Sequence, residues 1–428
     1  MRRVGLLAFS VLGAFIAGCS TAPTSRAPTD PSSSEVALKP LQVPALDQLI
    51  ETPERPLAGR FQGVQWGALP GWDHDQLEHV WQAFINNCKG LMRPISGSMA
   101  MPARAAPRAW QPVCLAAQQS ELNEHSTDSA AIRQFLQQHL QPWRLLDDKG
   151  QLAKNTVTGY YEPLIKASKT QQGPYQWPLY AVPDDLLTID LGGLYPELAG
   201  KRVRGKLVDG NRVVPYDTRA DIMGSAQRQP KTLVWAADPI EAFFLQIQGS
   251  GRAVLESGGA VRLAYADHNG HPYSSIGKWL ADQGELPLAK TSMQNIKAWA
   301  QNNPQRVPEM LQVNKAMVFF NEERITDPLL GPKGAYGIPL IAERAVAIDP
   351  TYVPLGTPVY LATTYPASTQ PLRKLVFAQD TGAAIKGAAR TDFYWGTGDA
   401  AGEQAGRMKQ TGEMWVLWPK HAGTPTAR

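Results

Sequence analysis

The spacing of apolar residues near the amino terminus predicts helices. Two stretches, residues 76–92 and 129–140, place large apolar side chains three to four positions apart, as one face of a helix requires. The side chains concerned are Val80, Phe84 and Ile85 in the first stretch, and Ile132, Phe135 and Leu136 in the second. We therefore expect residues 36–145 to be mainly helical.

Beyond residue 145 the pattern changes to short alternating runs bounded by Gly and Pro, which is typical of β-barrel or β-sandwich strands. The runs are NTVTGYYEP, KTLVWAAD, AFFLQIQGSG, AVRLAYAD, TPVYLATT, KLVFAQD and EMWVLWP. Two helical patterns, SSIGKWLADQG and TSMQNIKAWAQNN, interrupt them. The pattern of apolar residues thus predicts a mainly β protein with a helical amino-terminal part.

The chain begins with the features of a secretory signal, MRRVGLLAFSVLGAFIAGC. Arg2 and Arg3 precede an apolar run that is too short for a comfortable transmembrane helix. The ending FIAGC resembles a bacterial lipobox, in which the cysteine, here Cys19, receives lipid and becomes the first mature residue. An ordinary signal peptide with an incidental cysteine is the alternative. Ser20, in place of Asp, suits sorting to the outer membrane.

The composition after the signal narrows the possible partners. Residues 20–34 are rich in Pro, Ser and Thr and lack large apolar side chains, so we expect an extended tether. The net charge is only +4, and no cluster of Lys and Arg is present. The sequence therefore gives no indication of nucleic-acid binding.

Three cysteines occur in the chain. If Cys19 carries lipid, Cys88 and Cys114 remain as a pair in an oxidising compartment, where a disulfide is expected. Two buried thiols are the alternative, because separation in sequence does not give distance in space.

Several classes of site are excluded by their missing signatures. The histidines are scattered, no HExxH or CxxC is present, and the turn between His268 and His271 does not suit a metal site. Ser250 lies in QIQGSGR without a GxSxG motif, and the same loop lacks the later glycine of a dinucleotide fingerprint. We expect no metal and no cofactor.

Carboxylate, aromatic and amide residues remain as candidates for chemistry. Asp380 ends the run KLVFAQD, and Asp392 precedes three consecutive aromatic residues, with a loop of small residues between them. A carboxyl group that is desolvated against aromatic rings has a raised pKa, as a general acid needs. The alternative is that both aspartates stabilise turns or pair with Lys386 or Arg390.

Aromatic and amide side chains in two other runs could bind sugars. Tyr160 and Tyr161 precede Glu162 in VTGYYEP, and Gln246 and Gln248 stand two apart, which would place both amides on one face of a strand. Taken singly, each of these residues could equally belong to a core or to the solvated side of a strand. Together with the two aspartates they favour carbohydrate binding.

From VTGYYEP to MWVLWPK the chain resembles the membrane-bound lytic murein transglycosylase A family, and its carboxy-terminal segment resembles the 3D domain, named for three aspartates. The matching stretches include GYYEP, FFLQIQGSGR, YADHNGHPYSSIGK, GAYGIPLIAERAVAIDPTYVPLGTPVYL, QDTGAAIKG and RTDFYWGTG. The three aspartates correspond to Asp349, Asp380 and Asp392. The family pattern usually reads DTGGAIKG, so Ala383 replaces a glycine here.

The resemblance implies a double-psi β-barrel domain and a smaller inserted β-barrel domain with a groove between them. We accordingly expect a signal peptide at residues 1–18 and a lipidated tether at 19–36. The helical amino-terminal part of the barrel domain would follow at 37–159, the inserted barrel at 160–262, the double-psi (3D) part at 263–420 and a tail at 421–428.

The resemblance also implies roles for single residues. Asp392 would be the catalytic acid, Asp380 its neighbour, and Asp349 a structural residue. The positions expected to bind substrate, from the residues or from the resemblance, are Thr158, Tyr160, Tyr161, Gln246, Gln248, Ser250 and Lys386.

The activity implied is that of a lyase that cleaves the β-1,4 bond between N-acetylmuramic acid and N-acetylglucosamine in peptidoglycan and leaves 1,6-anhydro ends. Two alternatives remain open: an inverting glycoside hydrolase that uses Asp392 and Asp380, and a non-catalytic peptidoglycan-binding lipoprotein. We expect a monomer, lipid-anchored on the periplasmic side of the outer membrane, with glycan strands and possible murein synthases as partners.

Overall fold

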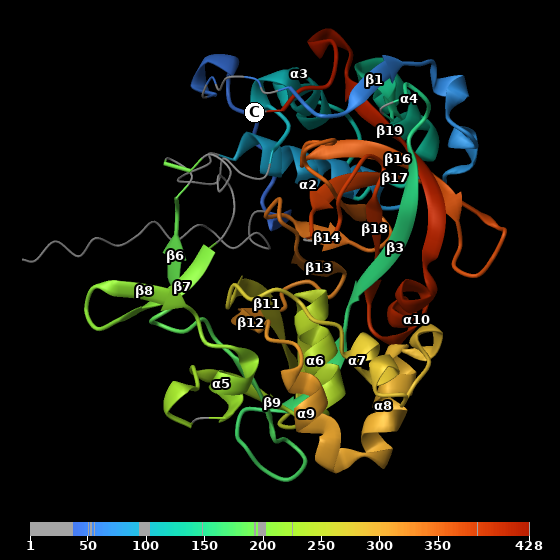
Figure 1. Ribbon diagram of the computed structural model, residues 1–428. Helices are drawn as coiled ribbons and strands as arrows, with labels where there is room; N and C mark the ends of the chain where they lie inside the picture. The colour runs from blue at the N-terminus through green and yellow to red at the C-terminus, as the bar shows by residue number, and fades with distance from the viewer. Residues whose placement is uncertain are drawn as a thin grey trace, which may run out of the picture. The chain divides into compact units, whose positions relative to one another are not determined.

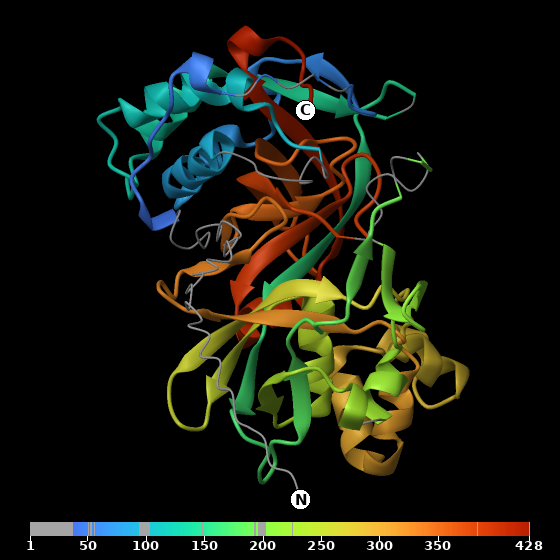
Figure 2. The ribbon, with the colours of Figure 1, turned by 90° about the vertical axis from the view of Figure 1, so that its left-hand side faces the viewer.

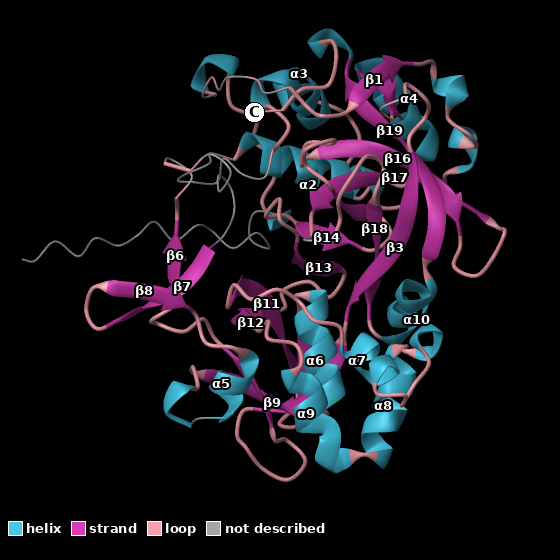
Figure 3. Cartoon of the chain, in the orientation of Figure 1, coloured by secondary structure: helices cyan, strands magenta, loops and turns pink. Residues whose placement is uncertain are grey.

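The structure is a computed structural model that describes residues 37–427, except residues 50, 52–53, 55, 94–102, 148, 192–193, 196–202, 225 and 383. The signal peptide and the whole of the predicted tether, including Cys19, lie outside the described residues, and so does Ala383. Strands predominate over helices in the described part of the chain (Figure 3).

The first sheet contains a closed barrel of six strands. Its strand order is β1-β2-β19-β16-β17-β15-β18-β3, and β3 also pairs with β19, which closes the ring (Figure 1). The bounds are β1 Arg60–Gly63, β2 Leu140–Leu146, β3 Lys154–Glu162, β15 Ala345–Ile348, β16 Thr357–Thr364, β17 Pro371–Asp380, β18 Thr391–Thr397 and β19 Lys409–Pro419. This closure removes the free edges that an open sheet would leave on these six strands.

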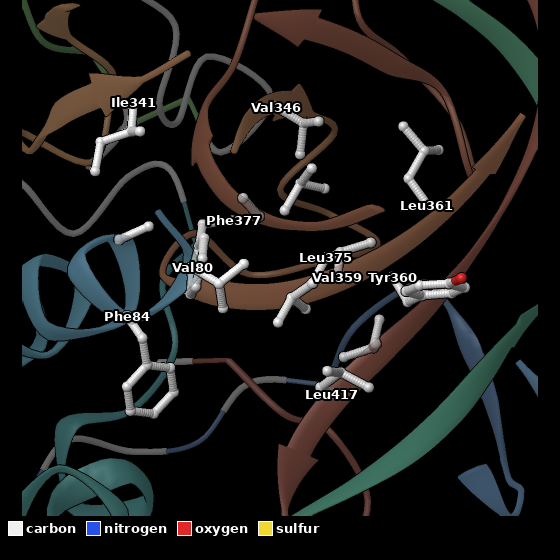
Figure 4. Packing of buried hydrophobic residues seen from close by; sticks show 14 of the residues in the cluster. Val80, Phe84, Ile341, Val346, Val359, Tyr360, Leu361, Leu375, Phe377 and Leu417 are labelled. Atoms are coloured by element: carbon white, nitrogen blue, oxygen red, sulfur yellow. The ribbon is translucent and has the colours of Figure 1, made fainter. Parts of the chain in front are cut away.

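Apolar side chains of the barrel strands and of the amino-terminal helices form the main core. Figure 4 shows Val359 and Tyr360 of β16, Leu375 of β17 and Leu417 of β19 in this core, together with Phe84 of helix α2, which spans Val80–Met92. All five are at most 1% exposed. The predicted runs TPVYLATT, KLVFAQD and EMWVLWP therefore supply the core of this barrel.

Three helices lie between β1 and β2 in the amino-terminal part: α2 Val80–Met92, α3 Pro107–Gln118 and α4 Ser129–His139. Two of them match the helices predicted from apolar spacing. Cys88 of α2 and Cys114 of α3 form a disulfide, with their Cα atoms 5.6 Å apart. The expectation of a mainly helical region is too broad, however, because residues 37–159 also contribute β1, β2 and β3 to the sheet.

The second barrel also has six strands, in the order β12-β11-β10-β4-β9-β5. A bridge between Ala181, just after β5, and Phe320 of β12 closes it. The bounds are β4 Leu164–Ser168, β5 Trp177–Tyr180, β9 Thr232–Ala236, β10 Gly251–Leu255, β11 Ala260–His268 and β12 Val318–Arg324. β11 and β12 pair side by side (Figure 2). The predicted end of this barrel, residue 262, falls inside β11 and excludes β12, so it lies too early in the chain.

Helices and a small sheet accompany the second barrel. The helices are α5 Arg219–Gly224, α6 Pro239–Gln248, α7 Ile276–Asp282, α8 Met293–Asn302 and α9 Val307–Gln312, and the sheet comprises β6 Leu187–Ile189, β7 Val203–Val208 and β8 Arg212–Pro215. A hairpin, β13 Leu330–Lys333 and β14 Pro339–Ile341, follows, and α10 Asp399–Arg407 precedes β19.

The run AFFLQIQGSG was predicted as a strand, and this prediction is wrong. Asp238 caps the amino terminus of α6 by accepting hydrogen bonds from Ile240 and Glu241 N–H, and Pro239 occupies the first helical turn. Gly249 ends the helix in the left-handed conformation, at φ 81°. These capping signals outweigh the strand preference of the aromatic and β-branched residues between them.

A buried ion cluster fixes the point where the chain leaves the first barrel for the second. Glu162, the last residue of β3, is fully buried and accepts hydrogen bonds from Arg252 of β10 at 2.7 Å and Arg262 of β11 at 2.6 Å. Thr397 of β18 donates a further hydrogen bond of 2.8 Å to the same carboxylate. Glu162 is thus satisfied within the fold, and it does not serve as a free carboxylate.

None of the helices in the described ranges is long and apolar enough to cross a membrane.

Candidate active site

Four neighbouring strands of the first barrel bring three predicted site residues into one row. Ala347 of β15 pairs with Asp380 of β17 on one side and with Asp392 of β18 on the other. Asp392 in turn pairs with Thr158 of β3. Because paired residues on adjacent strands project from the same side of a sheet, these four side chains share one face.

The pairing also sets the distance between the two aspartates. They are two strand spacings apart, which gives about 10 Å between their Cα atoms at roughly 4.8 Å per spacing. The residue between them, Ala347, is small and buried. The two carboxyl groups can therefore approach one face of a ligand without a bulky side chain in the way.

Asp392 has the properties of a proton donor near neutral pH. Thr158 Oγ1 donates a hydrogen bond of 2.7 Å to its Oδ1. Burial raises the pKa of Asp392 from 3.8 to about 6; the Thr158 hydrogen bond and Arg390 oppose this rise, and the charge of Asp380 adds to it. The group can thus be protonated at mildly acidic pH and ionised above it.

Asp380 is held by the backbone. Its Oδ1 accepts hydrogen bonds of 2.9 Å from the N–H groups of Ala335 and Thr381. Burial raises its pKa, while these two amides and the Tyr160 hydroxyl lower it. Tyr160 is itself affected by both carboxylates, since burial and the charges of Asp380 and Asp392 raise the pKa of its hydroxyl. Tyr160 therefore belongs to the site, close to both aspartates.

The aromatic residues that follow Asp392 do not all act as the sequence suggested. Phe393 and Trp395 point into the main core, because side chains alternate along a strand. Tyr394 lies on the other face, in a small cluster with Tyr160, and their ring centroids are 5.2 Å apart. The desolvation of Asp392 on its own face thus involves tyrosines, and not the adjacent Phe393.

Asp349 ties two loops together. Its Oδ1 accepts hydrogen bonds from the N–H and Oγ1 of Thr351, and its Oδ2 accepts one of 2.8 Å from Gly387 N–H. Gly387 belongs to the loop between the two other aspartates. With only 5% of its surface exposed, Asp349 is placed to hold that loop.

The remaining predicted binding residues lie in different surroundings. Gln246 is buried and accepts a hydrogen bond from Arg219 Nη2 at 2.7 Å, and it is not on the same face as Gln248, because two helical positions differ by about 200°. Gln248 Oε1 accepts a hydrogen bond from Tyr161 N–H. Ser250 accepts one from Tyr265 N–H, and Lys386 is exposed on the loop between the aspartates.

Three contributors to the site were not predicted as such. Ala335 donates through its backbone, and Ala347 separates the aspartates; neither residue type carries a sequence signal for such a role. Arg390, which lowers the pKa of Asp392 and donates to Thr156 O, was considered only as an ion-pair partner. Within the described ranges, no three side chains of His, Cys, Asp or Glu gather as a metal site.

Comparison with known families defines the class of protein to which this two-barrel architecture belongs. Residues 156–321 match the MltA specific insert domain, and residues 344–418 match the 3D domain. The first match spans the strands of the second barrel nearly completely, and the second covers β15 to β19.

Relatives that match about two thirds or more of the chain identify the family. The chain is 32% identical over 299 residues to membrane-bound lytic murein transglycosylase A of Escherichia coli K12, covering 68% of this chain and 72% of that protein. It is 30% identical to the Vibrio cholerae protein of the same name, covering 71% and 76%. The chain therefore belongs to the membrane-bound lytic murein transglycosylase A family.

Solved structures agree with this assignment. MltA from Neisseria gonorrhoeae superposes with a TM-score of 0.72 at 35% identity, covering 88% of this chain and 98% of that one. LtgG, a lytic transglycosylase of Burkholderia pseudomallei, gives 0.58 at 42% identity, covering 87% and 99%. E. coli MltA with bound chitohexaose gives 0.57 at 26% identity, covering 85% and 95%.

Proposed function

We propose that the protein is a lytic transglycosylase that cleaves the β-1,4 bond between N-acetylmuramic acid and N-acetylglucosamine in peptidoglycan and leaves 1,6-anhydro-N-acetylmuramic acid ends. The observation that carries the proposal is the raised pKa of Asp392, about 6, in a row of strands that also holds Asp380 and Thr158. The names of the relatives give the reaction class and the polymer.

Asp392 acts first as the acid. Thr158 occupies its Oδ1, so the catalytic proton resides on Oδ2 and passes to the glycosidic oxygen of the leaving N-acetylglucosamine. Loss of that proton leaves a carboxylate, which then accepts the proton of the attacking hydroxyl. One residue thus serves both half-steps, and the site ends the cycle in its starting protonation state.

The nucleophile is the 6-hydroxyl of the muramic acid residue, which closes onto its own C1. Because it is already attached, its effective concentration is on the order of 10⁵ M or more when aligned. Water must be kept from C1, since hydrolysis would otherwise compete. We place the bound glycan in a groove between the two barrels, of which the first has the double-psi form.

Asp380 and Tyr160 prepare Asp392 for the first step. Backbone amides fix Asp380, whose negative charge favours the protonated form of Asp392. Asp349 acts indirectly, because it accepts a hydrogen bond from Gly387 N–H and so holds the loop between Asp380 and Asp392. Of the other predicted residues, Tyr161, Gln248 and Lys386 are proposed to contact the glycan. Gln246 and Ser250 are proposed to support these contact residues from beneath, because both are buried and accept internal hydrogen bonds.

The spacing of the aspartates favours a second candidate, an inverting glycoside hydrolase with Asp392 as acid and Asp380 as base. Inverting enzymes keep their carboxyl groups about 6.5–9.5 Å apart to admit water, and two strand spacings are compatible with that range. A lipoprotein that binds peptidoglycan without cleaving it is the remaining alternative.

Product analysis separates the three functions. Purified sacculi are digested with the wild-type protein, and the released muropeptides are identified by mass spectrometry with and without borohydride reduction. Anhydro ends that resist reduction are expected. Reducible ends would identify the hydrolase, and no release would identify the binding protein. Asp392→Asn should abolish release, whereas Asp184→Asn, an exposed aspartate in the loop before β6, should not.

The cellular location is part of the same proposal. We infer a lipid anchor at Cys19 that holds a monomer on the periplasmic side of the outer membrane, with murein synthases as candidate partners. The relatives are described as membrane-bound, which supports membrane association. Cys19→Ala should move the protein from the membrane fraction to the soluble fraction; a variant that stays in the membrane fraction would contradict the anchor.

A further inference from the structure

Two adjoining pockets lie on the first barrel, away from the aspartates. One, of about 290 Å³, is lined by residues that include Trp66, Trp72 and Gln137. The other, of about 410 Å³, is lined by residues that include Arg373, and both share Gly71 and His74. Together they have the size of a small-ligand site.

The pockets are distinct from the candidate active site. Arg373 and Asp380 lie on the same strand, β17, seven residues apart. At about 3.3 Å per residue this places them roughly 23 Å apart along the strand. A ligand in these pockets would therefore not contact the aspartates.

Two indole N–H groups at the first pocket lack an acceptor. Trp66 Nε1 and Trp72 Nε1 are buried and have no hydrogen-bond partner among the described residues. Buried indole N–H groups usually find one. Other indoles without acceptors, such as Trp110 and Trp418, pack against each other in the core and line neither pocket. The first pocket differs from these core indoles because it has open space beside a partly exposed ring, that of Trp66.

A cation is held at the wall that both pockets share. Gly71 has φ 66°, and a Cβ atom there would lie 2.8 Å from Arg373 Nη1, so the guanidinium group occupies the space that a side chain would take. No carboxylate in the described part of the chain lies within ion-pair distance of Arg373, which is exposed. Its donors are therefore available to oxygen atoms of a ligand.

The rest of the lining is polar and nearly balanced in charge. Asp73 and His74 are exposed, and Gln137 is partly exposed. Asp75 is already paired with Arg344, and Lys374 with Glu343. An indole surface surrounded by uncharged or balanced donors and acceptors suits a neutral ligand with many hydroxyl and amide groups more than it suits an anion.

We propose that these two pockets form a second, non-catalytic glycan-binding site, which takes a chain of N-acetylated amino sugars. The indole of Trp66 packs against a sugar ring, and Arg373, Gln137 and Asp73 bond its hydroxyl and acetamido groups. The choice of this glycan rests on the proposed function. Such a site holds the protein on the cell-wall polymer independently of the cleavage step.

Binding is tested in the Asp392→Asn protein, which is expected not to degrade the polymer. Its affinity for chitotetraose is measured by titration calorimetry, and its retention on intact sacculi by co-sedimentation. Arg373→Ala and Gln137→Ala are added singly, with Arg212→Ala, a largely exposed arginine in β8, as the matched control. Each pocket variant should weaken retention about fivefold, the effect of one net hydrogen bond, and the control should not.

Two further variants test whether the ring of Trp66 and the position of Arg373 are needed for glycan binding. Trp66→Ala removes the ring that packs against the sugar, and Gly71→Ala displaces Arg373; both should reduce retention. Should either fail to fold, which thermal unfolding would show, Arg373→Ala and Gln137→Ala still decide the question.

In the cleavage-competent protein, Arg373→Ala should slow release from sacculi and leave turnover of a soluble short glycan unchanged. Retention equal to that of the control, or an equal loss on both substrates, would overturn the proposal. The wild-type protein could form no anhydro ends while the pocket variants still show weaker retention. That result would support this site and refute only the proposed reaction.

Discussion

Replacing Asp392, the proposed general acid, should stabilise the protein, and the size of the effect follows from the structure. The pKa of Asp392 rises from 3.8 to about 6 on folding, mainly through burial. The native state therefore binds this proton more tightly than the unfolded state, so stability falls as pH rises from about 4 to 6 and is then constant. Each pKa unit is worth about 1.4 kcal/mol, which gives a loss of about 3 kcal/mol above pH 6.

An Asn side chain at position 392 cannot ionise, so the variant does not lose this unfolding free energy as the pH rises. Asp392→Asn should therefore gain about 2 to 3 kcal/mol over the wild type at pH 8, since partial exposure of the group reduces the ideal value. At pH 4 the two proteins should have similar stability. Activity should fall at least about 100-fold, the usual contribution of general acid–base catalysis.

Urea denaturation followed by circular dichroism, at half-unit steps from pH 4 to 8, measures the difference. Asp184→Asn is the matched control, because that side chain is exposed. A stability difference between Asp392→Asn and wild type that does not change with pH would refute the reasoning, because it would show that Asp392 ionises as readily in the folded chain as in the unfolded one.

Three other changes have defined outcomes. Thr158→Val removes the hydrogen bond that lowers the pKa of Asp392, so the high-pH limb of the kcat/KM profile should move to higher pH; an unmoved limb would contradict this. Replacing Cys88 and Cys114 by Ala should cost about 3 kcal/mol of unfolding free energy, because the disulfide closes a loop between residues 26 apart; a loss below about 1 kcal/mol in urea would argue against it. Glu162→Gln should cost about 3–5 kcal/mol by leaving two buried arginines without a carboxylate, and a thermal midpoint equal to wild type would disprove that role.

The pattern of apolar residues predicted helices and strands correctly where no capping signal competed with it. Apolar spacing located α2 and α4, and alternation located β3, β9, β16 and β17, because burial of one face imposes a period that is visible in sequence. It failed at α6, where aromatic residues suggested a strand although Asp238, Pro239 and Gly249 carried the signals for the ends of a helix. At this segment the capping residues, and not the aromatic composition, determine the secondary structure.

The sequence alone determined the pair of cysteines and, through its resemblance to a known family, the type of protein, and it singled out Asp380 and Asp392 as the candidate acids. These are properties of residue type and order. Only the tertiary structure decided which groups meet: Thr158 with Asp392, the amide of Ala335 with Asp380, and Gly387 with Asp349. The reason is physical. A pKa depends on burial and on charges a few ångströms away, and strands far apart in the chain supply both, so no local pattern encodes them.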